Sequence, residues 1–213
     1  MHDTILFDIF LSTLRWLIGL CIGSCVGFLI ASLGRLRFLN KKYFNSFLDF
    51  FRALPIIGLV PIIQMNFGIN EYGKIGLIAW GVMFLVWLSV TKAYNKELPD
   101  AVLMLKASNV SKTEFKKIYT IPRIMGGLIN GIDIGIGIAW LCVVAAELIG
   151  TYSQGFWSGG LGYRLFDEYQ NNNWLEVHII LAIFGFLGIS SALLWRKCVT
   201  ISIKKTKGFN PLK

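Results

Sequence analysis

The sequence has few of the residues and motifs on which catalysis and metal binding depend. Its two histidines, His2 and His178, are far apart with no carboxylate pattern beside them, and its four cysteines show neither metal-ligand nor disulfide spacing. It contains no phosphate-binding loop of the GxxxxGK(S/T) type. The start, MHDTILFDIF, has no basic stretch and no small-residue cleavage site, so we expect no cleavable signal peptide. A membrane enzyme or scaffold is therefore a weak hypothesis.

Apolar residues are abundant instead. Hydrophobic residues make up 55% of the 213 residues, which is typical of a membrane protein and not of a soluble core. The formal net charge of +9 raises the question of nucleic-acid binding. The basic residues flank apolar runs, however, so membrane topology explains them better than phosphate contacts do.

Five apolar segments are long enough, or nearly so, to cross a hydrocarbon layer of about 30 Å. We therefore expect an all-α integral membrane protein with five transmembrane helices and one domain, residues 1–213. Residues 1–10 mix apolar and acidic side chains and are expected at the interface. The five segments are Leu11–Leu33, Phe44–Phe67, Lys74–Val90, Ile124–Ile149 and Trp174–Trp195.

Lysine and arginine predict the orientation. Four lie between the first two segments, seven between the third segment and the start of the fourth, and six in the C-terminal tail. The opposite side has only Arg15, Lys74 and Arg164. The positive-inside rule then places the N-terminus outside and the C-terminus in the cytoplasm.

The second segment, FFRALPIIGLVPIIQMNFG, contains prolines that should bend it. Pro55 and Pro61 each remove a backbone donor, and lipid tolerates such breaks only where neighbouring helices or a cavity satisfy the freed carbonyls. The segment is either a helix that lines a pathway or an ordinary kinked packing helix. Gln64 and Asn66 near its outer end favour the pathway slightly.

The fourth segment combines glycines with two acids. Gly127, Gly131 and Gly135 recur every four residues, which predicts close packing against another helix. Asp133 is about one-third of the way across, and we favour a structural hydrogen bond or ion pair for it over substrate contact. Glu147 lies near the outer end, where its side chain can snorkel to the interface.

Two further stretches lie outside the apolar segments. The outer loop, about residues 150–173, contains Gly159, Gly160 and Gly162, which predict a flexible turn, and it is either a gate, a docking surface or a plain connection. On the cytoplasmic side, about residues 98–121, we expect a short helix over Asp100–Ala107 and a second from near Lys112 toward Pro122. Ser111-Lys112-Thr113-Glu114 is a capping box for the second. The apolar surface of the first is expected in a partner groove or, alternatively, on the membrane surface.

Four blocks resemble the membrane subunits of binding-protein-dependent ABC importers. Asp100-Ala101-Val102 with Leu105-Lys106-Ala107-Ser108 is similar to the EAA…LGAS signature of that family. Arg52-Ala53-Leu54-Pro55, then Pro61 and Phe67-Gly68, is similar to its RAIP…P…FG block. GIAWLCVVAAELIG and the SGGLGY loop match two more. These blocks are typical of the nitrate/sulfonate/taurine branch, and the resemblance covers roughly residues 10–200.

The resemblance implies a homodimeric permease of the MetI-like fold in the bacterial inner membrane. The coupling residues would be Asp100, Ala101, Val102, Leu105, Lys106, Ala107 and Ser108, docked on a separate ATP-hydrolysing subunit that holds ATP and magnesium. This chain would bind no cofactor or metal and would not be an enzyme. An external binding protein would deliver a small anion (nitrate, a sulfonate, taurine or bicarbonate) or a vitamin precursor. Pathway and gate candidates are Arg52, Pro55, Pro61, Gln64, Asp133, Trp140, Glu147, Gly160 and Gly162.

The sequence departs from the family pattern in several places. Asp100 occupies the position of the signature glutamate, and Lys106 that of the signature glycine. The spacing from this signature to Pro122 is about three residues longer than is usual in the family. Many relatives have an extra N-terminal helix, which we do not expect here. An amino-acid-type ABC permease, which also has five spans, is the alternative, but the VVAAE and SGGLGY blocks argue against it.

Overall fold

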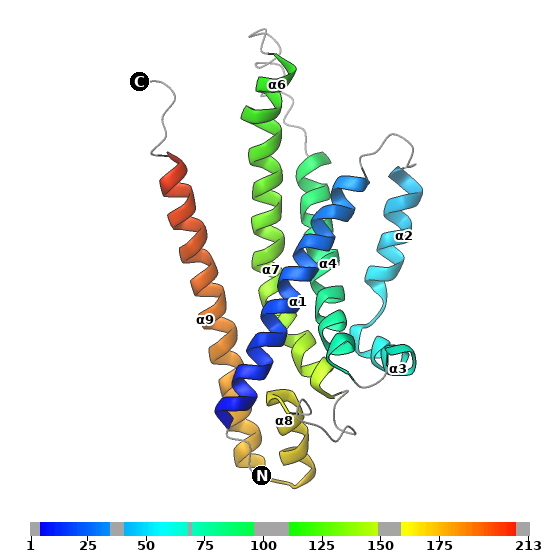
Figure 1. The fold of residues 1–213 in the computed structure, drawn as a ribbon, viewed down its shortest axis with the longest axis vertical. Coiled ribbons are helices and arrows are strands. Elements are labelled where there is room, and N and C mark those ends of the chain that lie inside the picture. Colours follow the sequence, from blue (N-terminus) through cyan, green and yellow to red (C-terminus); the bar gives the residue numbers. More distant parts are fainter. Residues whose placement is uncertain (1–4, 35–40, 68–69, 96–110, 149–158, 208–213) are drawn as a thin grey trace.

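The computed structural model describes residues 5–34, 41–67, 70–95, 111–148 and 159–207, and the regular structure in these ranges is helical. Within these ranges, four helices are long and apolar enough to cross a membrane, which confirms the all-α membrane class. Figure 1 shows them as a long bundle with the N-terminus at one end and the C-terminus near the other. The elements are α1 (Ile5–Leu33), α2 (Lys41–Ala53), α3 (Ile56–Phe67), α4 (Glu71–Asn95), α6 (Lys112–Phe115), the π-helix η1 (Lys116–Thr120), α7 (Ile121–Leu148), α8 (Leu161–Gln170) and α9 (Trp174–Lys207).

Helices α1, α4 and α7 form the packed centre of the bundle, and glycines allow their backbones to approach. On α7, Gly127 and Gly131 face α4, where a Cβ on Gly131 would lie 2.9 Å from Val86 Cα. The predicted close packing of this stripe against another helix is therefore confirmed, and that helix is α4 of the same chain. A second stripe, which was not predicted, lies on α1 and faces α4; its members are Gly19, Gly23 and Gly27. A Cβ on Gly23, for example, would lie 2.6 Å from the carbonyl oxygen of Ala79. Small residues at such positions permit close helix contact without side-chain displacement.

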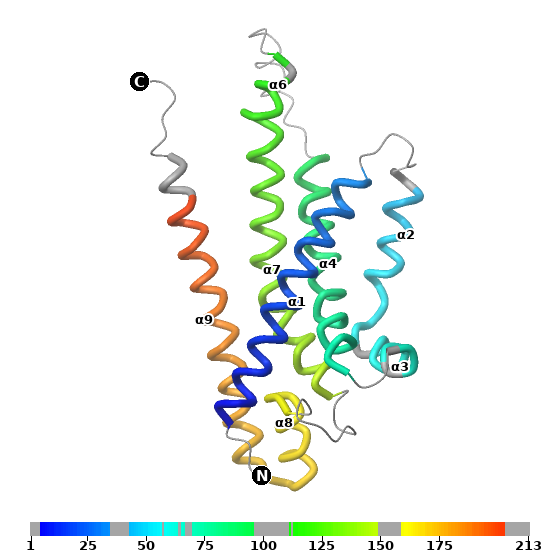
Figure 2. Tube along the Cα trace, viewed as in Figure 1, coloured from blue at the N-terminus to red at the C-terminus, as the bar shows by residue number. Residues whose placement is uncertain are grey.

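The expected second segment, Phe44–Phe67, is two helices in the structure. Helix α2 ends at Ala53 and α3 begins at Ile56, with Leu54 and Pro55 between them. Proline cannot donate a backbone hydrogen bond and disfavours a helical conformation in the residue before it, so the break falls here. Pro61 is accommodated inside α3. Figure 2 shows α3 lying across the foot of α2 instead of continuing its line.

The capping box at the start of α6 is present as predicted. The Ser111 backbone N–H and hydroxyl both donate to Glu114 Oε2, at 3.1 and 2.7 Å, and the Glu114 N–H donates to Ser111 Oγ at 3.3 Å. The expected end of this helix before Pro122 is wrong, because α6, η1 and α7 follow one another without a gap. In η1 the Ile121 N–H donates to the Lys116 carbonyl, five residues back. This wider turn relieves the clash that the Pro122 ring would cause in a regular helix.

Two observations concern the ends of the bundle. Residues 5–10, which we expect at the interface, form the first turns of α1, and Asp8 is buried. Helix α9 continues well past Trp195 to Lys207. Of the most apolar 18 residues of α9, only 6% are buried within the chain, whereas 61% of the corresponding 18 residues of α4 are buried. Helix α4 is therefore central, and α9 lies at the periphery of the described chain.

A tryptophan pair joins α1 to α7 in the centre of the bundle. The rings of Trp16 and Trp140 stack with centroids 5.3 Å apart and an interplanar angle of 15°. The Trp140 indole N–H donates to Ser191 Oγ on α9 at 3.1 Å, and Phe184 on α9 packs edge-on against the ring. Trp140 therefore ties α9 to the packed centre.

Candidate functional site

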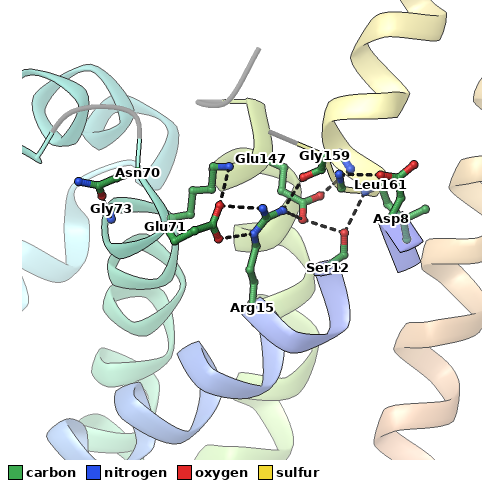
Figure 3. A network of polar contacts seen from close by, with 12 residues as sticks. Asp8, Ser12, Arg15, Asn70, Glu71, Gly73, Glu147, Gly159 and Leu161 are labelled. Carbon is green, nitrogen blue, oxygen red and sulfur yellow. Dashed lines mark hydrogen bonds and ion pairs between the residues drawn. The ribbon is translucent and has the colours of Figure 1, made fainter. Parts of the chain in front are cut away.

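Charged side chains, most of them buried, meet where α1 and α4 begin and α7 ends; Figure 3 shows their contacts. They come from the first turns of α1 and α4, the last turn of α7 and the start of α8. Because α1 and α4 begin at this end and α7 ends there, residues far apart in sequence become neighbours. We refer to the group as the polar cluster, and its side chains are Asp8, Ser12, Arg15, Glu71, Lys74, Glu147 and Arg164.

Arg15 is the centre of the polar cluster. Its Nε and Nη2 donate to the two carboxylate oxygens of Glu71 at 2.7 and 2.8 Å, a bidentate pair. Its Nη1 donates to Glu147 Oε1 at 2.8 Å and to the Gly159 carbonyl at 2.7 Å. The Arg15 side chain is 3% exposed, so one guanidinium joins α1, α4, α7 and the segment before α8 without contact to solvent.

Glu147 is fully buried, and its carboxylate is satisfied from three sides. Oε1 accepts from Arg15 and, at 2.7 Å, from the Ser12 hydroxyl. Oε2 accepts from the Gly162 backbone N–H at 2.7 Å. Snorkelling of Glu147 to the interface, which the sequence left possible, does not occur in this structure. An arginine, a hydroxyl and a backbone donor hold its charge inside the protein.

The glycines of the outer loop are held by the polar cluster. The Gly160 N–H donates to Asp8 Oδ1 at 2.9 Å, and the Leu161 N–H donates to Ser12 Oγ at 2.9 Å. Gly160 has φ 136°, a conformation that side-chain-bearing residues rarely adopt, and a Cβ there would lie 2.5 Å from Glu147 Oε1. The described part of this loop is thus pinned, and the prediction of a flexible turn is wrong for Gly159, Gly160 and Gly162.

The formal charges of the polar cluster balance. Arg15, Lys74 and Arg164 face Glu71, Glu147 and Asp8, with ion pairs of 2.7 to 3.1 Å. Buried charges persist only when they are paired and hydrogen-bonded, and removing one partner is costly. The polar cluster therefore holds four elements in one arrangement, and the chain uses six charges to do so.

Asp133 lies apart from the polar cluster and has a partner. Arg196 Nε lies 3.3 Å from Asp133 Oδ1, and Nη2 lies 3.4 Å from Oδ2. The arginine side chain is 66% exposed and that of Asp133 30% exposed. The ion pair that we favoured for Asp133 is present, between α7 and α9.

Pro55 and Trp140 line one groove of about 700 Å³ between α3, α7, α8 and α9. Its other walls include Gly137, Leu141, Phe184 and further apolar side chains. Of the remaining candidates, Arg52 is exposed and pairs with Asp49 at 3.5 Å. Pro61 is exposed on α3, and Gln64 belongs to the same helix.

Of the pathway and gate candidates, Glu147, Gly160 and Gly162 therefore lie together at the polar cluster, and Pro55 and Trp140 lie together in the groove. The coupling candidates, Asp100 to Lys106 with Ala107 and Ser108, lie outside the described residues. Within the ranges that the structure describes, three or more metal-ligand side chains do not gather in any one place.

Sequence reasoning missed most of the polar cluster. We used Arg15 and Lys74 only to count charges for topology, and gave Asp8, Ser12 and Glu71 no role. A usable signal was present: Arg15 and Glu147 both lie near one end of apolar segments, and a charge there needs an opposite partner. Matching the positive charge of Arg15 with the negative charge of Glu147 would have predicted an ion pair between the first and fourth segments.

Comparisons with known proteins agree with this architecture. Among curated relatives, a putative aliphatic sulfonates transport permease of Bacillus subtilis is 28% identical over 180 residues, covering 84% of this chain and 62% of that protein. The nitrate import permease of Synechococcus elongatus is 28% identical over 187 residues, covering 86% and 64%. A bicarbonate transport system permease of the same organism is 24% identical, covering 80% and 60%. The chain therefore spans somewhat under two thirds of these relatives' lengths.

Solved structures share the fold. A MetNI methionine ABC transporter in an inward-facing conformation superposes with a TM-score of 0.67 at 14% identity, covering 92% of this chain and 95% of that one. An amino acid ABC transporter gives 0.65 at 14% identity, covering 94% and 92%. The model of the family described as "Binding-protein-dependent transport system inner membrane component" matches residues 23–203, well over half of the chain. With this match, and with four membrane-length helices among the residues that the structure describes, the chain belongs to that family.

Proposed function

We propose that this chain is the permease subunit of a binding-protein-dependent ABC importer and forms the substrate pathway across the bacterial inner membrane. The observation that carries the proposal is the family match over residues 23–203, in a chain with four membrane-length helices. The relatives named above import sulfonates, nitrate and bicarbonate, which favours a small oxyanion as cargo, with taurine or a vitamin precursor as further possibilities. The methionine and amino-acid transporters share only the fold at 14% identity, so they do not favour an amino-acid cargo.

Three partners follow from this proposal. A cytoplasmic ATPase subunit, which holds ATP and magnesium, binds the cytoplasmic segment at about residues 98–121, which we call the elbow. An external binding protein delivers the cargo. A second copy of this chain completes the pathway. The low burial of α9 leaves surface for that copy, because only 6% of its most apolar 18 residues are buried within the chain.

The mechanism is alternating access driven from the elbow. Closure of the ATPase pair moves the elbow, and the continuous helical run of α6, η1 and α7 carries this movement into the membrane. The distribution of lysine and arginine places the elbow and the C-terminus in the cytoplasm. The polar cluster then lies at the outer end, where it keeps α1, α4, α7 and the start of α8 together as a rigid body.

Reconstitution tests the proposal. The chain is placed in proteoliposomes with its ATPase and binding protein, and ATP-dependent uptake of nitrate, taurine, methanesulfonate and bicarbonate is measured. We expect Ala101→Glu with Leu105→Glu to insert normally but to lose uptake and stimulated ATP hydrolysis, because the charges disrupt an apolar contact. The conservative pair Ala101→Ser with Leu105→Met serves as the control. Uptake by the chain alone, or normal uptake and stimulated hydrolysis in the glutamate pair, would contradict the proposal.

A further inference from the structure

The ion pair between Asp133 and Arg196 differs from the polar cluster in its exposure. The Arg15 side chain is 3% exposed, whereas that of Arg196 is 66% exposed. The contacts of Arg196 are also longer, at 3.3 and 3.4 Å. Arg196 lies on α9 and Asp133 on α7, so this ion pair joins the two helices. Arg196 is therefore an accessible cation that is held less closely than Arg15.

The guanidinium of Arg196 has one edge occupied and another open. Asp133 takes Nε and Nη2, and Nη1 takes part in neither contact. Arginine carries five N–H donors in a planar fork, so the edge formed by Nη1 and the second Nη2 hydrogen still offers two parallel donors. This edge matches two oxygens of a small oxyanion, whether planar like nitrate or tetrahedral like a sulfonate.

The exposed face of α7 around Asp133 carries one further polar side chain, Asn130, with the exposed apolar side chains Ile134 and Leu141 at its edge. On α7, Gly126, Asn130 and Gly137 share its face and are exposed, while the opposite stripe packs against α4. Gly137 also lines the 700 Å³ groove, one turn along α7 from Asp133. An ion pair that faced hydrocarbon would be costly, so this face is expected to border a water-filled space.

We propose that Arg196, oriented by Asp133, is a binding site for a small oxyanion in the cytoplasmic half of the pathway. This inference rests on the proposed function and adds the residue and the cargo chemistry to it. Asp133 is a positioning residue that also neutralises the guanidinium. A neutral pair binds an anion weakly, and a transport site must release its cargo as readily as it accepts it.

Thermal unfolding of the purified permease–ATPase complex tests the site without relying on transport. The complex is heated in nitrate, methanesulfonate or bicarbonate, with chloride at equal ionic strength as the baseline. We expect at least one oxyanion to raise Tm with a saturable dependence on concentration. Arg196→Gln should raise the half-saturating concentration by about tenfold or more, the loss expected for a charge-assisted hydrogen bond. Lys197→Gln removes the same charge one residue further along α9 and should leave that concentration within about twofold, because successive side chains of a helix point about 100° apart and Lys197 faces away from Asp133.

Asp133 gives a second, opposite readout. Asp133→Asn keeps the shape and removes the neutralising charge, so the half-saturating oxyanion concentration should fall, while ATP-dependent uptake slows because release is slower. Asp133→Glu should restore both. A purely structural role would lower Tm in every solution alike and would leave the half-saturating concentration unchanged.

The outcomes separate this inference from the proposed function. Absence of a specific oxyanion effect on the wild-type complex, or equal effects of Arg196→Gln and Lys197→Gln, would overturn the site. If the wild-type complex takes up an oxyanion with ATP and Arg196→Gln does so equally well, the function stands and the site is wrong. If no ATP-dependent uptake occurs, the proposed function fails, and the thermal measurement still reports on Arg196.

Discussion

Replacing Arg15 by methionine should destabilise the protein more than removing any exposed arginine. Methionine has a similar length and fills most of the space, so the effect reports on lost charge and hydrogen bonds and not on a large cavity. The substitution removes four hydrogen bonds of 2.7 to 2.8 Å, to Glu71, Glu147 and the Gly159 carbonyl. Glu147, whose side chain is 0% exposed, then loses the cation that lies 2.8 Å from it.

The expected loss follows from this burial. Breaking a buried ion pair by removing one partner costs about 3–5 kcal/mol, because the remaining charge stays buried without compensation. Glu147 retains its bonds from Ser12 and the Gly162 N–H, and Glu71 retains Lys74. These contacts keep the expected value near the lower end of that range. The matched control is Arg52→Met, whose partner Asp49 is 52% exposed, so we expect a loss of about 1 kcal/mol or less.

The assay is reversible unfolding in mixed detergent micelles, with the free energy of unfolding taken from an SDS titration. A double-mutant cycle with Glu147→Gln isolates the pairwise contribution. We expect Arg15→Met with Glu147→Gln to be more stable than the sum of the single losses implies, by about 1–3 kcal/mol, since residues in one network are coupled. Additive losses, or a loss from Arg15→Met no larger than that from Arg52→Met, would refute the role we assign to the polar cluster.

Three further predictions concern backbone geometry. Gly160→Ala should destabilise by at least about 1–3 kcal/mol from its φ of 136° alone, and should also displace the Glu147 carboxylate, as the same SDS titration would show. Gly127→Ala should destabilise by about 1–3 kcal/mol because its Cβ would lie 2.6 Å from a side chain of α4. Gly126→Ala, whose added Cβ would have no heavy atom within 4 Å, should leave the free energy of unfolding unchanged or raise it. Equal effects of Gly127→Ala and Gly126→Ala would contradict the close packing of α7 on α4. Ser111→Ala removes the capping box and should cost about 0.5–2 kcal/mol, seen as faster amide hydrogen exchange in α6, and unchanged exchange would contradict the cap.

The helices were predictable where local rules decide. The apolar runs located all four membrane-length helices, because no other backbone conformation satisfies its own polar groups in lipid. The break at Pro55 and the capping box at Ser111 were also predictable, since both depend on residues a few positions apart. The passage of α7 through Pro122 was not, because it depends on a π-turn that widens the helix just before the ring.

The candidate site was predictable only in part. Glu147, Gly160 and Gly162 were chosen from a family resemblance, without knowledge that they touch. Their environment was misjudged: Glu147 was expected near solvent and is buried, and the glycines were expected to be mobile and are pinned. Asp133 was expected to have a partner, but the sequence did not indicate that this partner is Arg196, 63 residues away.

The sequence by itself determined that this chain is a helical membrane protein, where its helices break, and which residues carry charge into apolar segments. Those properties follow from the solvation of side chains and of the backbone, which act over one or two turns of helix. Only the tertiary structure decided which charges meet. Arg15 reaches Glu147 across 132 residues because glycines on α1 and α7 let both helices pack closely on α4. Pairing at that distance depends on the register of three helices, which local sequence does not encode.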